Sequence, residues 1–224
     1  MSATASVATL HGDPNHLGHG AGGRGEARVP GRGTGGPAPK RVVAAYGFWI
    51  FILSDIVMFA AFFAGYAVLV GGTADGPKGP ELFDLGNVAI ETALLLASSF
   101  TCGMAILALG ARRMLPFQAA MAVTFLLGAG FLALELIEFR DLVARGAGPS
   151  RSAFLSAFFT LVGCHGLHVG IGLLWLLTMM AQVLAKGFRA DIVRRTRCFA
   201  LFWHALDIVW VGVFSVVYLL GVIP

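Results

Sequence analysis

Five long apolar stretches follow one another along the chain, separated by short polar joints. They cover residues 46–70, 88–110, 117–139, 153–185 and 198–223. Each has the ~20 residues needed to cross a hydrocarbon core about 30 Å thick, and the fourth is long enough to tilt or to project beyond the bilayer. Because lipid offers no hydrogen bonds to the backbone, each stretch is expected to be helical. The pattern predicts an all-α membrane protein, a bundle of five transmembrane helices.

The composition agrees with a chain that is solvated by lipid. Apolar residues make up 57% of the sequence and charged residues 12%, and the mean hydropathy is +0.80. A soluble domain carries about twice that charged fraction. The net charge of +4 does not indicate nucleic-acid binding, because the basic residues sit in the joints and the N-terminal segment rather than on one soluble face.

The first 42 residues differ from the rest. They contain ten glycines and four prolines, with His11, His16 and His19, and almost no large apolar side chain. Such a composition cannot offset the entropy lost on ordering. We expect residues 1–42 to form a disordered Gly/Pro/His-rich cytoplasmic tail and residues 43–224 to form the five-helix domain.

The distribution of basic residues predicts the orientation. Twelve Lys and Arg residues lie on one side of the predicted bundle and four on the other. The twelve are Arg24, Arg28, Arg32, Lys40, Arg41, Arg112, Arg113, Lys186, Arg189, Arg194, Arg195 and Arg197, and the four are Lys78, Arg140, Arg145 and Arg151. The positive-inside rule therefore places the N-terminus in the cytoplasm and the C-terminus on the periplasmic side.

Eight ionisable side chains fall within the apolar stretches, where no Lys or Arg lies at depth. They are Asp55, Glu91, Glu135, Glu138, His165, His168, His204 and Asp207. A charged carboxylate at mid-bilayer costs about 2.5–3.5 kcal/mol on insertion scales. These acids must therefore be protonated, hydrogen-bonded, close to an interface, or directed at another protein.

Spacing groups six of these side chains into pairs on one helix face. The pairs are Glu135 with Glu138, His165 with His168, and His204 with Asp207. Gly166 and Gly170 have the small-xxx-small spacing that lets helix backbones approach closely. We expect the third, fourth and fifth helices to pack together, with histidines and acids paired between them.

Three interpretations of this cluster are open. Membrane haems are held by histidines from two facing helices, but His165 and His168 share one helix and leave only His204 opposite. A di-metal carboxylate site needs two Glu-x-x-His pairs, and none occurs. A buried hydrogen-bond network that fixes the helix register is the third. Cys102, Cys164 and Cys198 have no CxxC spacing and are expected to be buried small apolar residues.

The sequences of the stretches are specific when taken together. The first contains G-F-W-I-F-I-L-S-D-I-V-M-F, the second I-E-T-A-L-L-L-A-S-S-F-T-C-G-M-A and the third G-A-G-F-L-A-L-E-L-I-E-F. The fourth contains V-G-C-H-G-L-H-V and the fifth L-F-W-H-A-L-D-I-V-W. In this order, over about residues 46–223, they resemble subunit III of the haem-copper terminal oxidases. The five-helix form and the short joints are most similar to the cytochrome o-type ubiquinol oxidases, and the cytochrome c oxidase equivalent is the alternative.

This resemblance implies a non-catalytic subunit of a proton-pumping oxidase in the bacterial inner membrane. Subunit III of the family carries no haem, copper or quinone of its own; the haems and copper are expected in subunit I. It packs beside subunit I and binds phospholipid. The expected partners are subunits I and II, a small subunit IV and membrane lipids. Asp55 falls on the position of the family's carbodiimide-reactive carboxylate. A stand-alone haem-binding or transport protein is the alternative of another class.

Overall fold

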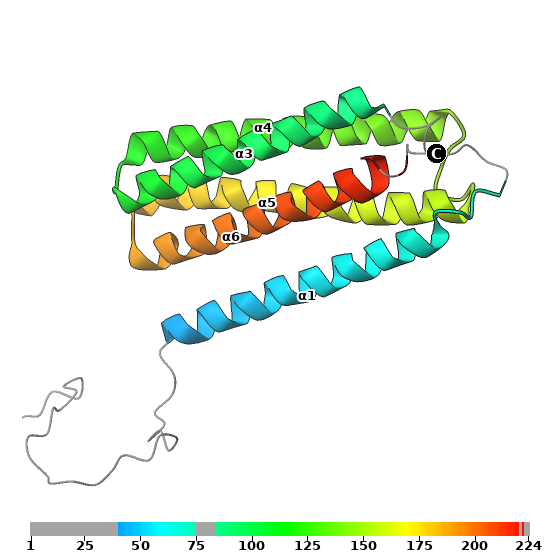
Figure 1. Cartoon of the computed structure of the whole chain (residues 1–224). Helices are drawn as coiled ribbons and strands as arrows, with labels where there is room; N and C mark the ends of the chain where they lie inside the picture. Colours follow the sequence, from blue (N-terminus) through cyan, green and yellow to red (C-terminus); the bar gives the residue numbers. More distant parts are fainter. Residues whose placement is uncertain (1–39, 75–83, 220, 222–224) are drawn as a thin grey trace, which may run out of the picture. The chain divides into compact units, whose positions relative to one another are not determined.

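A computed structural model describes residues 40–74, 84–219 and 221 of the chain. Within these residues the secondary structure is helical, without strands. The helices are α1 (Lys40–Leu69), α3 (Leu85–Gly110), α4 (Met114–Ala144), α5 (Ala153–Lys186) and α6 (Ala190–Val213), the last continued by one π-helical segment, η1 (Phe214–Leu219) (Figure 1). All five helices are long and apolar enough to cross a membrane. The prediction of five transmembrane helices is confirmed.

The helices extend beyond the apolar stretches that predicted them. α6 begins at Ala190 rather than at residue 198, so Arg194, Arg195 and Arg197 belong to its first turns and not to a joint. Arginine is a good helix former, and a helix has to be apolar only where it meets hydrocarbon. α1 likewise begins at Lys40, within the segment expected to be a tail. Residues 1–39 of that segment lie outside the described residues.

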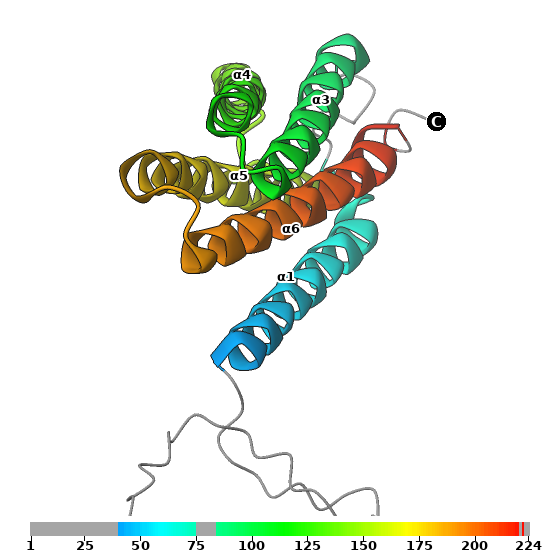
Figure 2. The same ribbon diagram turned by 90° about the vertical axis from the view of Figure 1, so that its left-hand side faces the viewer.

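Four helices form a group, and α1 packs on one side of it. α3 contacts α4 and α6, and α5 contacts α4 and α6. α1 contacts α5 and, to a smaller extent, α6, and in two perpendicular views it lies at the edge of the group (Figures 1 and 2). Successive helices run in opposite directions (Figure 1). The arrangement therefore places α5 and α6 between α1 and the pair α3–α4.

Local signals fix where the helices begin and end. Asp84 precedes α3, and its side chain accepts a hydrogen bond from the amide of Gly86 at 2.9 Å. Ser152 caps α5 in the same way through the amide of Leu155. Both are side chains that favour the N-cap position, because their oxygen replaces a missing helical acceptor. Gly187 ends α5 with φ +67°, a conformation that favours glycine.

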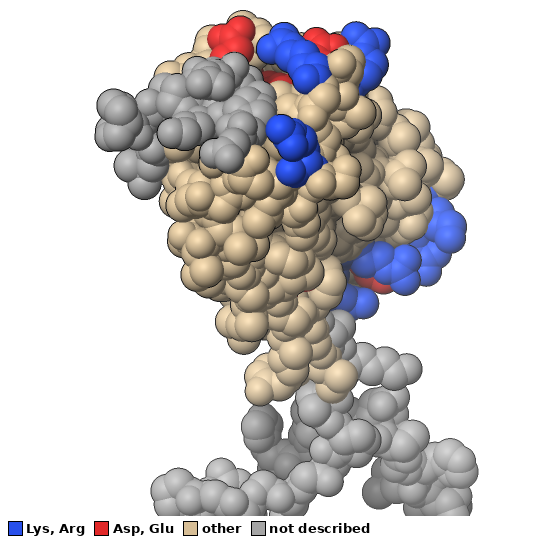
Figure 3. Space-filling view, turned by 90° about the vertical axis from the view of Figure 1, so that its right-hand side faces the viewer, with Lys and Arg blue, Asp and Glu red and all other residues tan. Residues whose placement is uncertain are grey.

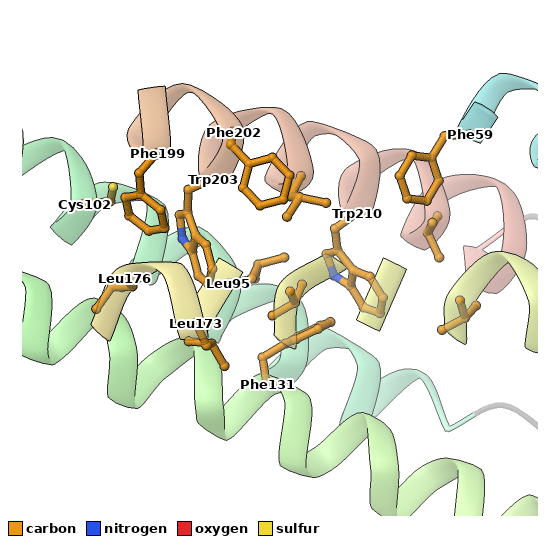
Figure 4. Packing of buried hydrophobic residues seen from close by; sticks show 14 of the residues in the cluster. Phe59, Leu95, Cys102, Phe131, Leu173, Leu176, Phe199, Phe202, Trp203 and Trp210 are labelled. Atoms are coloured by element: carbon orange, nitrogen blue, oxygen red, sulfur yellow. The ribbon is translucent and has the colours of Figure 1, made fainter. Parts of the chain in front are cut away.

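Aromatic side chains of α6 fill the interior of the group. Trp203 and Trp210 point from α6 toward α3, α4 and α5, and Phe131 of α4 packs edge-on against Trp210 (Figure 4). A Cβ atom added to Gly128 of α4 or to Gly172 of α5 would stand 2.9 Å from the ring of Trp203. These two glycines provide the space for a fully buried indole, and they explain how three helices meet at one large side chain.

The outer surface is apolar over most of its described area. Large side chains such as Phe100 of α3, Leu126 of α4 and Ile208 of α6 are 68–73% exposed. Lys, Arg, Asp and Glu side chains gather in a few groups, and most of the remaining visible surface has none (Figure 3). Apolar exposure on every side is unfavourable in water and is what hydrocarbon requires.

Candidate functional site

The buried polar groups of α6 bond chiefly to α3. The ring nitrogen Nδ1 of His204 and the hydroxyl of Ser99 lie 2.6 Å apart. The indole N–H of Trp203 donates to the hydroxyl of Ser98 at 3.1 Å. One further indole, that of Trp210, donates to Thr92 at 3.0 Å. These bonds form a polar seam between the two helices, and we call it the α3–α6 seam.

The α3–α6 seam has a regular register. Moving along α6 from Trp203 to Trp210, the partner on α3 goes back from Ser98 to Thr92, as antiparallel helices require. Each bond satisfies a donor that would be costly to bury alone. Hydroxyl groups that bond across helices are common packing elements in membranes. The apolar pattern of the sequence does not point to these hydroxyls, although the spacing of Thr92 and Ser98, about two turns, matches that of the two tryptophans.

His165 is fully buried in the interior of the group. Its Nε2–H donates to the backbone carbonyl of Leu206 on α6 at 3.3 Å, and its Nδ1 has no partner among the described residues. The ring lies between the rings of Phe131 and Trp210, with centroid distances of 5.7 and 5.0 Å. The imidazole is thus enclosed by aromatic rings, and its Nε2 is taken up by a contact between α5 and α6.

His168 and Asp55 lie where α1 meets α5. Nδ1–H of His168 donates to the carbonyl of Cys164 in its own helix at 2.7 Å, and its ring packs on Phe59 of α1 at 5.3 Å. Asp55 is close enough to His168 to interact with it electrostatically. Asp55 also borders a small apolar cavity of about 20 Å³ between α1 and α6. The carboxyl is thus partly buried at the edge of the four-helix group.

Three glutamates on α3 and α4 lie near one another. Glu91 and Glu135 are each 1% exposed, and each has an Oε2 atom with no partner among the described residues. Glu138 accepts a hydrogen bond from the hydroxyl of Tyr218 at 3.2 Å. All three glutamates interact electrostatically. The carboxyl of Glu135 also lies directly against Gly166 of α5, where an added Cβ would stand 2.5 Å from Oε1.

The arrangement differs from the expected pairing of histidines with acids. Among the hydrogen bonds and ion pairs of the described residues, none joins a histidine to a carboxylate. His204 bonds to a serine, His165 and His168 to backbone carbonyls, and Glu138 to a tyrosine. Asp207 lies near His204 electrostatically, and its buried Oδ1 has no partner in the described part of the chain. Glu91, Glu135 and His165 are buried and the other polar groups are half-buried, and the partners of these groups are mostly hydroxyls and carbonyls.

The described side chains do not form a cluster of metal ligands. Within residues 40–74, 84–219 and 221, no three His, Cys, Asp or Glu side chains are close enough together to hold one. All three cysteines are free, with Cys102 buried and the other two partly buried. Fold and polar groups together define a multi-pass helical membrane protein in which the buried polar side chains connect helices.

Comparison with known proteins gives the family. Residues 36–222 match the family described as cytochrome c oxidase subunit III. The cytochrome bo(3) ubiquinol oxidase subunit 3 of Pseudomonas aeruginosa is 54% identical over 79% of this chain and 84% of its own length. The corresponding protein of Pseudomonas putida is 51% identical over 79% and 86%. The cytochrome c oxidase subunit 3 of Bacillus sp. strain PS3 is 44% identical over 79% and 86%.

The chain belongs to the cytochrome c oxidase subunit III family. Five helices in its described residues are long and apolar enough to cross a membrane, and it is a multi-pass protein of the bacterial inner membrane. The resemblance seen in the sequence is thereby confirmed, and membership of an oxidase complex implies other oxidase subunits as partners.

Proposed function

We propose that this chain is the non-catalytic subunit III of a proton-pumping haem-copper oxidase that takes electrons from ubiquinol. The observation that carries the proposal is the 54% identity with a ubiquinol oxidase subunit 3 over 79% of the chain. The redox centres, haems and copper, belong to subunit I in this proposal. The role of this chain is to pack against subunit I, together with subunit II, and to keep the complex intact during turnover.

The buried polar groups fit a supporting role. His165 is enclosed by aromatic rings and bonds to a backbone carbonyl, and His204 bonds to Ser99. Ring nitrogens used in this way hold helices together and do not face an open site. We propose that Glu91, Glu135, Glu138, His165, His168, His204 and Asp207 act in helix packing, and that Asp55 occupies the family's carbodiimide-reactive position.

We further propose a cytoplasmic N-terminus and a periplasmic C-terminus. The observation behind this orientation is the excess of basic residues on the side of the α3–α4 and α5–α6 turns, including Arg112, Arg113 and Arg194. The exposed flank of α1 leaves one side of the bundle open. Lipid and a small helical subunit IV are proposed to cover it, and cross-linking that never captures a small subunit beside α1 would count against this.

The second candidate electron donor is cytochrome c, because one relative at 44% identity is a cytochrome c oxidase subunit 3. Isolation from native membranes separates the two. A subunit II without copper together with ubiquinol-dependent oxygen consumption supports the first proposal, and a copper-containing subunit II supports the second. A Soret band in the isolated chain would instead favour a stand-alone haem protein.

A further inference from the structure

A pocket of about 330 Å³ lies between the beginning of α3 and the end of α4. Both helices contribute polar side chains to its lining, which are Asp84, Asn87 and Glu91 on one side and Glu138, Asp141 and Arg145 on the other. Residues spaced three or four apart share a face of a helix. Two polar faces are thus turned toward the same space.

The acids of the pocket stand at two depths. Asp84 is exposed and Asp141 is half-buried, whereas Glu138, further inside, is half-buried and Glu91 is only 1% exposed. Oε2 of Glu91 has no hydrogen-bond partner among the described residues. A buried carboxyl oxygen without a donor is costly, so a ligand that brings N–H groups to the inner end of the pocket would be stabilised there.

Charge and size limit the kind of ligand. Four carboxyl groups and one guanidinium, that of Arg145, line the pocket, so it attracts cations. The volume equals that of roughly ten water molecules at about 30 Å³ each, and no trio of acids within the described residues is close enough to hold a metal ion. Leu134, Ile137 and Leu142 add apolar wall. Acids together with an apolar wall favour an organic cation with an aliphatic part.

The spacing of the acids suggests a ligand with two positive ends. Asp84 and Glu91 are seven residues apart, about 10 Å along the helix axis, and Glu138 and Asp141 are three apart, about 4.5 Å. With bonds of about 1.5 Å, the two nitrogens of an extended four-carbon diamine are separated by a distance within this range. One ammonium group can therefore meet the inner acids while the other meets the outer acids.

We propose that this pocket binds a short aliphatic diamine, with one ammonium group at Glu91 and Glu138 and the other at Asp84 and Asp141. Each ammonium group has three N–H donors, and the inner one supplies the donor that Oε2 of Glu91 lacks. The methylene groups lie along the apolar wall. The inference goes beyond the proposed function and does not depend on the electron donor of the complex.

Two arginines oppose the binding of a cation, and both lie at the outer end. Arg145 is exposed and lines the pocket. Arg140 pairs with Asp141 at 3.4 Å, but the side chains of this pair are 76% and 47% exposed. An exposed ion pair contributes little, so a ligand can compete for Asp141. Most of the binding free energy is expected from the inner acids.

The test is isothermal titration calorimetry of the intact purified complex with 1,4-diaminobutane. The comparison probes are 1-aminobutane, which has one ammonium group, and Mg²⁺. We expect the diamine to bind more tightly than either probe. The Glu91→Gln/Glu138→Gln variant removes two charged acceptors at nearly constant volume and should weaken diamine binding about tenfold or more.

Two variants at the outer end have effects of opposite sign. Asp84→Asn/Asp141→Asn should weaken diamine binding about two- to fivefold, and asparagine is also a favoured N-cap residue, so α3 keeps its cap. Arg145→Gln should strengthen binding by a similar factor, because it removes a repelling charge. General damage to the fold would not strengthen binding.

The Asp191→Asn variant is the matched control, because Asp191 is an acid at the other end of the bundle with Arg189 as its neighbour. It should bind the diamine like the unchanged complex. Equal affinity for the diamine and 1-aminobutane, tighter binding of Mg²⁺, or undiminished diamine binding by the double glutamine variant would each overturn the proposal. Subunit composition and oxygen consumption are recorded on the same samples, so failure here is distinguishable from failure of the proposed function.

Discussion

Trp203 occupies a space that two glycines leave open. Its ring lies against Gly128 of α4 and Gly172 of α5 and is 1% exposed. Helices in lipid lack a hydrophobic force between them and depend on close packing and hydrogen bonds. Because the Trp203 N–H is also held by Ser98, the ring cannot turn away without losing a bond. The position of this one side chain therefore constrains three helices.

The Gly172→Ala variant should destabilise the bundle. The new methyl group would meet the buried ring, and overpacking costs about 1–3 kcal/mol, against a gain of about 0.5–1 kcal/mol in helix propensity. The midpoint of thermal unfolding of the purified chain in detergent measures the change in stability that Gly172→Ala causes. Gly103→Ala on α3 is the control, since nothing lies within 4 Å of an added Cβ there, and it should be neutral or slightly stabilising. Equal midpoints for the two variants would contradict this packing.

His204 and Ser99 form the shortest bond of the α3–α6 seam, at 2.6 Å. We expect His204→Ala to weaken assembly with subunit I while the haem spectrum of the assembled complex stays unchanged. A double-mutant cycle with Ser99→Ala should give a coupling of about 0.6 kcal/mol, the average for hydrogen bonds between membrane helices, and at most about 1.7 kcal/mol. Glu135→Ala should likewise lower the yield of complex without a spectral change.

Two outcomes for the His204 and Ser99 variants would contradict a packing role. Full assembly with loss of a haem signal would mean that the imidazole ligates a redox centre. Zero coupling between positions 99 and 204 would mean that their contact adds nothing to packing.

At the scale of the elements, the π-helical turn η1 changes the direction of side chains at the end of α6. A π-helical turn widens the helix, and here the hydroxyl of Tyr218 reaches Glu138 of α4 at 3.2 Å. The buried ring of Tyr218 also packs on Phe158 of α5 at 5.9 Å. The Tyr218 side chain therefore connects the end of α6 with α4 and α5.

Tyr218→Phe should keep the packing of the ring and remove the hydroxyl. Loss of the hydrogen bond to the half-buried Glu138 carboxyl should cost up to about 1–3 kcal/mol, so the purified chain should unfold in detergent at a lower temperature. Tyr46→Phe is the control, because Tyr46 is 70% exposed. A Tyr218→Phe variant as stable as the control would contradict a role for this bond.

The sequence predicts the positions of the helices better than the hydrogen bonds between them. The five apolar stretches located the helices, because hydrocarbon imposes both their length and their helical state. The start of α6 was misplaced, since Arg194 and Arg195 interrupt the apolar pattern without interrupting the helix. The bonds of His204 to Ser99 and of Glu138 to Tyr218 depend on how helices cross, and spacing along one helix carries no information about the neighbouring helix.

Across the whole molecule, the end with the α3–α4 and α5–α6 turns carries more Lys and Arg residues than the opposite end, and we expect it to face the cytoplasm. In a background without the three native cysteines, one cysteine is placed at Ser150, in the exposed α4–α5 turn, or at Ala111, in the exposed α3–α4 turn. A membrane-impermeant maleimide added to intact spheroplasts should label position 150 and not position 111. Labelling of position 111 alone would reverse the orientation.

We propose that this chain supports an oxidase without carrying a redox centre of its own. The most direct test is purification of the tagged full-length chain from its native membranes, with subunit composition, visible spectrum, copper content and oxygen consumption measured on the same sample. We expect the chain to copurify with subunits I and II, with haem and copper in subunit I, no copper in subunit II, and oxygen consumption that depends on ubiquinol. A chain that purifies alone with its own Soret band would contradict it.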